Sequence, residues 1–373
     1  MRILLILFCL FLWSGCAVSA QTTDGDSATT PDSYRVYAGD GTPSSLEAVM
    51  AAMGDVDVVF VGETHNDPTA HMLQAELLKA AFMRYGAGNA AGQPRPVTLS
   101  MEMFERDVQY VVEEYLADLI TEKQFLASSR PWQNYETDYR PLVEFARAHR
   151  LAVVAANAPR RYVNRVTRLG PASLDELSDQ ALATLPPLPF ASASSAYQAK
   201  WDKLMAEAMA EMMAASKEKA EADSSETADE HGKMADGEHG KMADGEHGEM
   251  ADGEHGKMDE AEAASAGASM HGGPSYLIDA QSLWDASMAH SLAKALMAQP
   301  GALVLHMVGG FHVEGATGTP EHLLRYRPGT RILVVAVRPH TDVTAFDAEE
   351  FGGLGDFVIL TDEELPRTFD AGS

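Results

Sequence analysis

Four apolar segments of the chain each lead into a side chain that can bind a metal, form a hydrogen bond or transfer a proton. Glu63 and His65 follow the first segment, Glu102 lies at the end of the second, Asn157 ends the third, and His312 follows the fourth. Ligands bind beyond the carboxyl ends of the strands in an open parallel sheet. One such residue would be explained by a solvated loop or a helix cap, but four in matching positions indicate a shared crevice.

Two of these segment ends carry the pattern Gly-x-x-His, as GETH ending in His65 and GGFH ending in His312. Glycine lets the backbone turn sharply where a strand ends, and the histidine can then point back across the sheet. These two imidazoles, together with Glu63 and Glu102, would supply nitrogen and oxygen ligands suited to Zn, Mn, Fe or Co. A divalent metal site is therefore one interpretation of the crevice.

Predicted apolar strands and predicted helices alternate along the chain, and these elements must position the residues named above. Continuous apolar strands between helices indicate a parallel sheet that is covered on both faces. We therefore predict an α/β fold with a mostly parallel sheet and helices on both faces, plus a smaller helical part and a disordered repeat insert. The predicted strands are 56–62, 96–104, 151–157, 302–312, 331–339 and 357–362, and the predicted helices are 67–85, 107–119, 140–149, 161–169, 197–215 and 276–298.

Six short sequences occur in a fixed order between about residues 45 and 340: VVFVGETHNDPTAH, LSMEMFERDVQ, YRPLVEFAR, VVAANAPR, AQSLWDASMA and VGGFHVEG. Together they resemble the ChaN-type haem-binding uptake lipoproteins, which belong to a superfamily that includes Tiki and TraB proteins. The resemblance implies an α/β fold, a lipid anchor, and haem binding linked to iron uptake. The superfamily pattern carries over to Glu63, His65, Glu102 and His312, and Asn157, Arg160 and Asp285 match family motifs as pocket residues without an assigned role.

Tyrosine can hold haem in such proteins, because its phenolate is a hard oxygen ligand suited to ferric iron. The sequence NYETDYRPL supplies Tyr135 and Tyr139 beside Trp132, which could stack on a porphyrin. The alternative, that these aromatic residues only anchor the following helix, stays open. No Cys-x-x-Cys-His sequence is present, so haem would not be attached covalently. Arginines near the crevice that could pair with the two propionates are Arg106, Arg140, Arg160 and Arg161.

Residues 1–20 are typical of a secretory signal, with Arg2 followed by a short apolar stretch and then small residues. Cleavage after Ala20 would suit an ordinary signal peptidase, whereas SGC ending at Cys16 resembles a bacterial lipobox. The only other cysteine is Cys9, inside the apolar stretch, so no disulfide framework is available. We expect lipidation of Cys16 and an exported protein, anchored in the outer membrane and facing the periplasm.

The remaining organisation comprises a tether at 21–44, the two parts of the α/β domain at 45–215 and 273–373, and a low-complexity insert at 216–272. The formal net charge of the whole chain is −27, which argues against a nucleic-acid partner. An eight-residue repeat in the insert places histidine and methionine three positions apart. Imidazole with thioether favours Cu(I), and the acidic residues would bind harder divalent ions weakly. The pairs are His231 with Met234, His239 with Met242, His247 with Met250, and His255 with Met258.

Three functions are compatible with these features. The first is a haem-binding uptake lipoprotein that is not a catalyst, with haem, an outer-membrane receptor and a second copy of the chain as partners. The second is a metal-dependent hydrolase in which a glutamate acts as general base on a metal-bound water. The third is a periplasmic copper-binding protein whose α/β domain is only a scaffold, and a solvating spacer without ligands remains the alternative for the insert.

Overall fold

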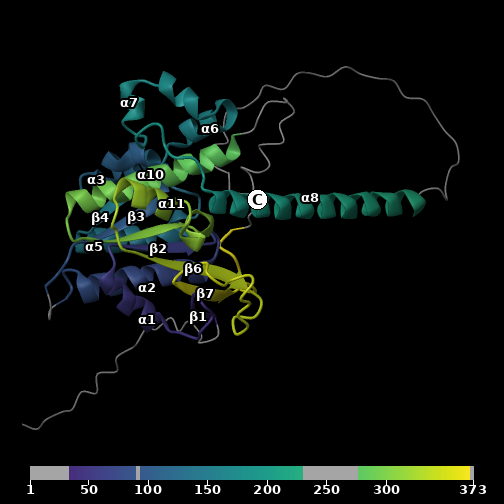
Figure 1. Ribbon diagram of the computed structural model, residues 1–373, viewed down its shortest axis with the longest axis horizontal. Helices are drawn as coiled ribbons and strands as arrows, with labels where there is room; N and C mark the ends of the chain where they lie inside the picture. Colours follow the sequence, from purple (N-terminus) through teal and green to yellow (C-terminus); the bar gives the residue numbers. More distant parts are fainter. Residues whose placement is uncertain (1–32, 90–92, 230–275, 370–373) are drawn as a thin grey trace, which may run out of the picture. The chain divides into compact units, whose positions relative to one another are not determined.

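The computed structural model describes residues 33–89, 93–229 and 276–369. They contain a seven-stranded sheet with the strand order β1-β7-β6-β2-β5-β3-β4 (Figure 1). Six neighbouring strands are parallel, and β1 pairs antiparallel with β7 at one edge. The strands are β1 (Tyr34–Ala38), β2 (Val58–Glu63), β3 (Val97–Glu105), β4 (Ala152–Asn157), β5 (Leu303–Gly309), β6 (Ile332–His340) and β7 (Phe357–Asp362).

Helices cover both faces of this sheet. In Figure 1, α1 and α2 lie below the sheet and α10 lies above it. The helices are α1 (Leu46–Ala52), α2 (Pro68–Tyr85), α3 (Gln109–Leu116), α4 (Glu122–Ser129), α5 (Arg140–His149), α6 (Arg160–Leu169), α7 (Asp179–Leu182), α8 (Ser195–Asp229), α10 (Leu277–Ala298) and α11 (Thr319–Tyr326). Shorter helical turns are η1 (Met53–Asp55), η2 (Arg106–Val108), the π-helical η3 (Tyr135–Tyr139), η4 (Pro171–Glu176), η6 (Gly310–His312) and η7 (Glu314–Ala316).

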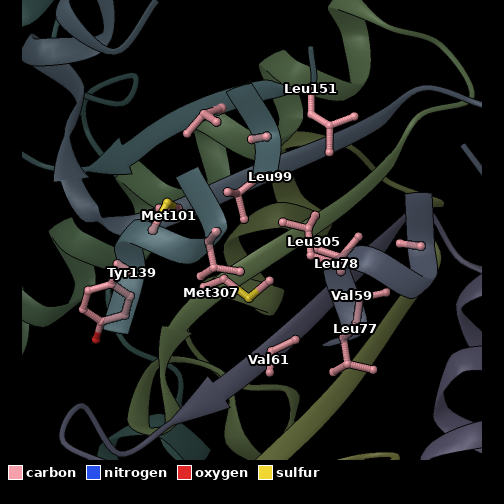
Figure 2. Close-up of a cluster of buried hydrophobic side chains, with 14 of the residues drawn as sticks. Val59, Val61, Leu77, Leu78, Leu99, Met101, Tyr139, Leu151, Leu305 and Met307 are labelled. Atoms are coloured by element: carbon pink, nitrogen blue, oxygen red, sulfur yellow. The ribbon is translucent and has the colours of Figure 1, made fainter. Parts of the chain in front are cut away.

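Alternating strand residues build two separate cores on the two faces. Val59 and Val61 of β2 join Leu305 and Met307 of β5 in the core packed by α2 and α5, part of which Figure 2 shows. The intervening positions of β2 and β5 face α10 and α11 in a second core. All six residues of β2 are buried, as expected for a central strand of a parallel sheet.

The helix that follows β2 begins at a strong sequence signal. The side chain of Asp67 accepts hydrogen bonds from the backbone N–H groups of Thr69 at 2.9 Å and Ala70 at 3.3 Å. Pro68 occupies the first helical position, where no backbone N–H is needed. This capped N-terminal end places α2 next to the Glu63–His65 segment.

The predicted fold class is confirmed, including a smaller helical part formed by α6, η4 and α7 around its own apolar cluster with α10. All predicted strands and helices are present, and apart from the end of the helix predicted at 197–215 their ends differ by a few residues. The predicted strand 302–312 ends at Gly309, and residues 310–312 form a 3-10 turn. The insert residues 230–275 and the signal segment with Cys16 lie outside the described residues.

The elements that were not predicted include β1, the short helices α1, α4, α7 and α11, and the π-helical η3. Residues 34–38 belong to the stretch interpreted as a tether, but they pair with β7 and complete the sheet. The helix predicted at 197–215 continues as α8 to Asp229, into the segment assigned to the insert. Among the described residues, no helix is long and apolar enough to cross a membrane.

Candidate functional site

The structure separates the glutamates of the predicted crevice onto opposite faces of the sheet. Glu63 lies two positions after Val61, so it points to the face covered by α2. Glu102 lies one position after Met101, so it points to the other face, where it meets His312. The four residues proposed as one metal centre therefore form two clusters. No group of three or more His, Cys, Asp or Glu side chains that could hold a metal occurs in the described part of the chain.

The first cluster is built around the carboxylate of Glu63, which is only 3% exposed. Its Oε1 lies 2.9 Å from Nδ1 of His65 and accepts a hydrogen bond of 2.6 Å from the Tyr139 hydroxyl. Its Oε2 accepts a short hydrogen bond from the amide of Gln74 and lies 3.3 Å from Nε2 of His71. Side chains from β2, the loop after it, α2 and η3 thus converge on one buried carboxylate.

The charges of this cluster stabilise one another. Burial by itself raises the pKa of the Glu63 carboxyl, but His71 and His65 outweigh burial and lower that pKa to about 2. Burial by itself lowers the pKa of the His71 imidazole, but Glu63 and Asp138 outweigh it and raise that pKa to about 10. His71 bridges the two acids, since its Nδ1 lies 3.3 Å from Oδ2 of Asp138. The cluster therefore contains a protonated imidazole between two carboxylates at neutral pH.

His65 is the member of this cluster that reaches the surface, with 14% of its side chain exposed. The indole of Trp132 meets its imidazole edge-on, with ring centroids 4.7 Å apart. The side-chain amide of Asn134 donates to the backbone carbonyl of His65 at 3.0 Å and to Asp138 at 2.7 Å. These contacts fix both the backbone and the ring plane of His65.

The second cluster surrounds His312 on the face covered by α10. Nδ1 of His312 lies 2.9 Å from Oδ1 of Asp285, and Nε2 lies 3.7 Å from Oε1 of Glu102. Thr319 donates to the same Asp285 oxygen at 2.8 Å, and the backbone N–H of Gly309 donates to Glu102 at 2.7 Å. Burial by itself raises the pKa of Asp285, but His312 outweighs burial and lowers it. This cluster is almost fully buried, since His312 is 1% exposed and Asp285 is 0% exposed.

The glycine of the first Gly-x-x-His sequence is required for close packing rather than for a sharp turn. Gly62 lies within β2, and a Cβ there would come within 2.9 Å of Val313 and 3.1 Å of the backbone of Gly310. The absence of a side chain lets the loop after β5 cross directly over β2. Gly318 does need a special conformation, with φ of +66°, and a Cβ there would lie 2.6 Å from the carbonyl oxygen of His312.

The two predicted tyrosine ligands lie in the interior. Tyr139 is 0% exposed, and Figure 2 shows it at the edge of the apolar cluster, with its hydroxyl turned away from the labelled aliphatic side chains. Tyr135 is 3% exposed and packs against Phe104 and Phe125. Burial raises the pKa of both phenols, and the neighbouring Glu63 raises that of Tyr139 further. Their ligation of iron stays a prediction.

The other predicted residues lie around the carboxyl edge in different roles. Asn157 ends β4 and accepts a hydrogen bond from the backbone N–H of Ala158 at 2.9 Å. Arg160 begins α6, is exposed, and forms no ion pair within the described residues. Among the further arginines, Arg140 pairs with Glu122, Arg161 pairs with Asp107, and Arg106 has a buried Nη1 without a hydrogen-bond partner in the described structure.

Sequence reasoning missed His71, Gln74 and Asp138 as partners of Glu63. His71 and Gln74 are three positions apart on α2, so they share the helix face that is turned to the sheet. Polar residues on the buried face of an otherwise apolar helix were the available signal. Asp138 lies in the π-helical turn, whose geometry is not visible in the residue pattern.

The fold and the paired histidine–carboxylate clusters define an open α/β protein with polar sites at the carboxyl ends of its parallel strands. The chain belongs to the family described as haem-binding uptake, Tiki superfamily, ChaN, whose model matches residues 49–323.

Among solved structures, the chain is similar to one titled "Cofacial heme binding to ChaN of Campylobacter jejuni", at 13% identity and a TM-score of 0.50, covering 88% of this chain and 97% of that one. This likeness shows the fold. A succinoglycan biosynthesis protein is similar at 11% identity and a TM-score of 0.41, covering 85% of this chain and 90% of that one. An erythromycin esterase mutant in its open conformation is similar at 10% identity and a TM-score of 0.38, covering 82% of this chain and 77% of that one. No curated protein sequence matches the chain.

Replacing Glu63 by Gln should lower the pKa of His71 from about 10 by about 1–3 units, because it removes one of two neighbouring negative charges. A histidine with a raised pKa contributes stability that is fully present below its unfolded pKa, about 6.5, and is lost as pH rises towards 10. The wild-type protein should therefore lose stability over this range, and E63Q should lose less. Imidazole NMR titration and denaturant midpoints at several pH values measure the two effects.

The matched control is E102Q, because Glu102 lies on the opposite face of the sheet. This variant should leave the His71 pKa near 10. Equal shifts in the two variants would contradict the division of the site into two clusters.

Proposed function

We propose that this chain binds haem at the carboxyl edge of its sheet and that Nε2 of His65 bonds the haem iron. The observation that carries the proposal is the pairing of a surface-reaching imidazole with a buried carboxylate, in a chain that belongs to a haem-binding family. Haem is a cargo in this proposal, and no chemical step on it is required.

The Glu63–His65 pair suits an iron ligand for two reasons. A carboxylate can only accept, so Nδ1 of His65 donates to it and the lone pair of a neutral imidazole lies on Nε2. A carboxylate behind a ligating histidine also fixes the ring orientation and makes the nitrogen a better donor. The edge-on indole of Trp132 supplies an aromatic wall beside the ring.

His65 fits this role better than the two tyrosines that the family resemblance suggested. A phenolate ligand must ionise and reach the iron, whereas Tyr135 and Tyr139 are buried and burial raises the pKa of both. Among the described residues, the tyrosine with the most exposed side chain is Tyr110 on α3, at 64%. Tyr110 is therefore the tyrosine to compare with His65.

Arginine can hold the propionates through paired N–H donors. Arg140 and Arg161 already pair with acidic side chains. Arg160, which is exposed on the first turn of α6, is the better candidate. An uptake role, with a membrane receptor and a second copy of the chain as partners, belongs to the same proposal.

Replacing His65 by Ala should weaken hemin binding by at least about tenfold, equivalent to about 1.4 kcal/mol, because the bond to iron is lost. Binding is measured from the Soret band of the purified mature protein titrated with hemin. Replacing Tyr135 or Tyr139 by Phe should change the affinity far less and leave the spectrum that of histidine ligation.

The control for His65 is His149→Ala, which removes an exposed imidazole at the end of α5. A tyrosinate charge-transfer band that disappears in Tyr110→Phe but persists in the His65 variant would show that Tyr110, and not His65, bonds the haem iron. Absence of any Soret change at micromolar hemin would reject haem binding altogether.

We propose further that the protein is exported and anchored in the outer membrane through lipid on Cys16. Support comes from the lipobox-like SGC sequence and from the lack of cysteine after it. Replacing Cys16 by Ala should release the protein from the membrane fraction and remove the acyl mass from its mature N-terminus. The Cys9→Ala variant keeps the proposed attachment residue and should remain anchored. Equal membrane association of wild type and C16A would reject lipid anchoring at Cys16.

We propose that the His/Met repeats bind Cu(I) as a weak, exchangeable metal buffer. Deleting residues 230–260 should reduce the number of bound Cu(I) ions by about four, one for each repeat. A variant with the four histidines changed to Gln and the four methionines changed to Leu keeps the length and the acidic residues, and it should lose the same ions. Binding unchanged in both variants would leave the repeats as a solvating spacer.

A further inference from the structure

Helix α8 is packed against the domain by its first turns. Tyr197 and Trp201, which are 1% and 8% exposed, surround Phe311 with ring centroids 5.1 Å and 5.9 Å from it. Met205 packs against the same aromatic cluster. The apolar residues of this part of the helix are therefore accounted for by packing.

Lys200 binds the same turns to the loop that follows β5 and contains His312. Its ammonium donates to the carbonyl oxygens of Phe311 at 2.5 Å and Glu314 at 3.0 Å, and to the hydroxyl of Thr317 at 2.7 Å. It also lies 4.7 Å from the ring centroid of Phe311. Three oxygen acceptors and the ring of Phe311 thus surround the Lys200 ammonium. These contacts fix the position at which α8 extends from the domain.

Beyond this anchor the helix presents methionines to solvent. Met209, Met212 and Met213 are 54%, 55% and 66% exposed, so packing does not account for them. Every apolar side chain larger than alanine from residue 205 to residue 216 is methionine. Met209 lies three positions before Met212 and four before Met213, so it is a neighbour of both on the helix surface, at about 5–6 Å between Cβ atoms.

We infer that Met209, Met212 and Met213 form a Cu(I) site with three thioether ligands. Thioether sulfur is a soft ligand that selects Cu(I) over harder divalent ions. Methionine has three rotatable bonds beyond its backbone, so three sulfurs from one helix face can converge on one ion. Binding involves no change in oxidation state, since the ion enters and leaves as Cu(I). The inference is independent of haem binding and of the repeats.

The competing explanation is that a protein partner covers this apolar face, because flexible methionine surfaces also bind partners. Leucine keeps the apolar character and the helix but removes sulfur. The triple variant M209L/M212L/M213L therefore separates the two explanations.

The test uses the full mature chain labelled with ¹³C at the methionine methyl groups, and Ag(I) as a redox-inert substitute for Cu(I). The methyl signals of the three residues, assigned by single leucine variants, should move together and saturate at about one ion per three methionines. The triple variant should bind about one ion fewer than the wild type. Met83 and Met297, which are exposed at 53% and 63% elsewhere in the fold, are the internal controls and should not move at the same Ag(I) concentration.

Three outcomes would overturn the inference. Shifts of Met83 and Met297 at the same concentration would show that any exposed thioether binds the ion. Unchanged shifts of two methionines after the third is replaced by Leu would show that they share no ion. An unchanged number of bound Ag(I) ions in the triple variant would reject the metal site and favour a protein partner on this helix face.

Discussion

The buried carboxylate of Glu63 is the constraint on which much of the candidate site depends. An isolated charge in the interior of a protein costs several kcal/mol unless it is paired and hydrogen-bonded. Glu63 meets this requirement through His65, Gln74, His71 and Tyr139, which come from the following loop, from α2 and from η3. The positions of these segments relative to β2 are therefore coupled, because moving any one of them would leave the carboxylate less well paired.

The same principle operates independently on the other face of the sheet. There Asp285 of α10 and Glu102 of β3 flank His312, and Thr319 donates a further hydrogen bond to Asp285. Because strand side chains alternate between faces, two residues at neighbouring strand ends can belong to different cores. The two Gly-x-x-His sequences thus serve two clusters that the sheet separates, rather than one metal centre.

The two clusters differ in solvent exposure, and this difference indicates a different role for each. His65 has an exposed edge, whereas His312 and Asp285 are almost completely enclosed. A ligand as large as haem can approach only an imidazole that reaches the surface. The enclosed cluster instead connects the loop after β5 to α10, and the anchor of α8 at Lys200 lies on the same loop. The helix that leads towards the repeats is therefore tied to the polar framework of the domain.

The sequence by itself determined the fold class and family membership, because apolar strands, helix starts such as Asp67-Pro68 and the six spaced motifs are local signals. It also identified Glu63, His65 and His312 as polar residues that follow strands, and it marked Asp285 only as a match to a family motif. Their grouping was decided only by the tertiary structure. The face to which Glu102 points depends on the strand register, which is set by pairing with distant strands. The partners His71 and Asp138 depend on how α2 and a π-helical turn pack together, and packing of this kind leaves no periodic trace in the sequence.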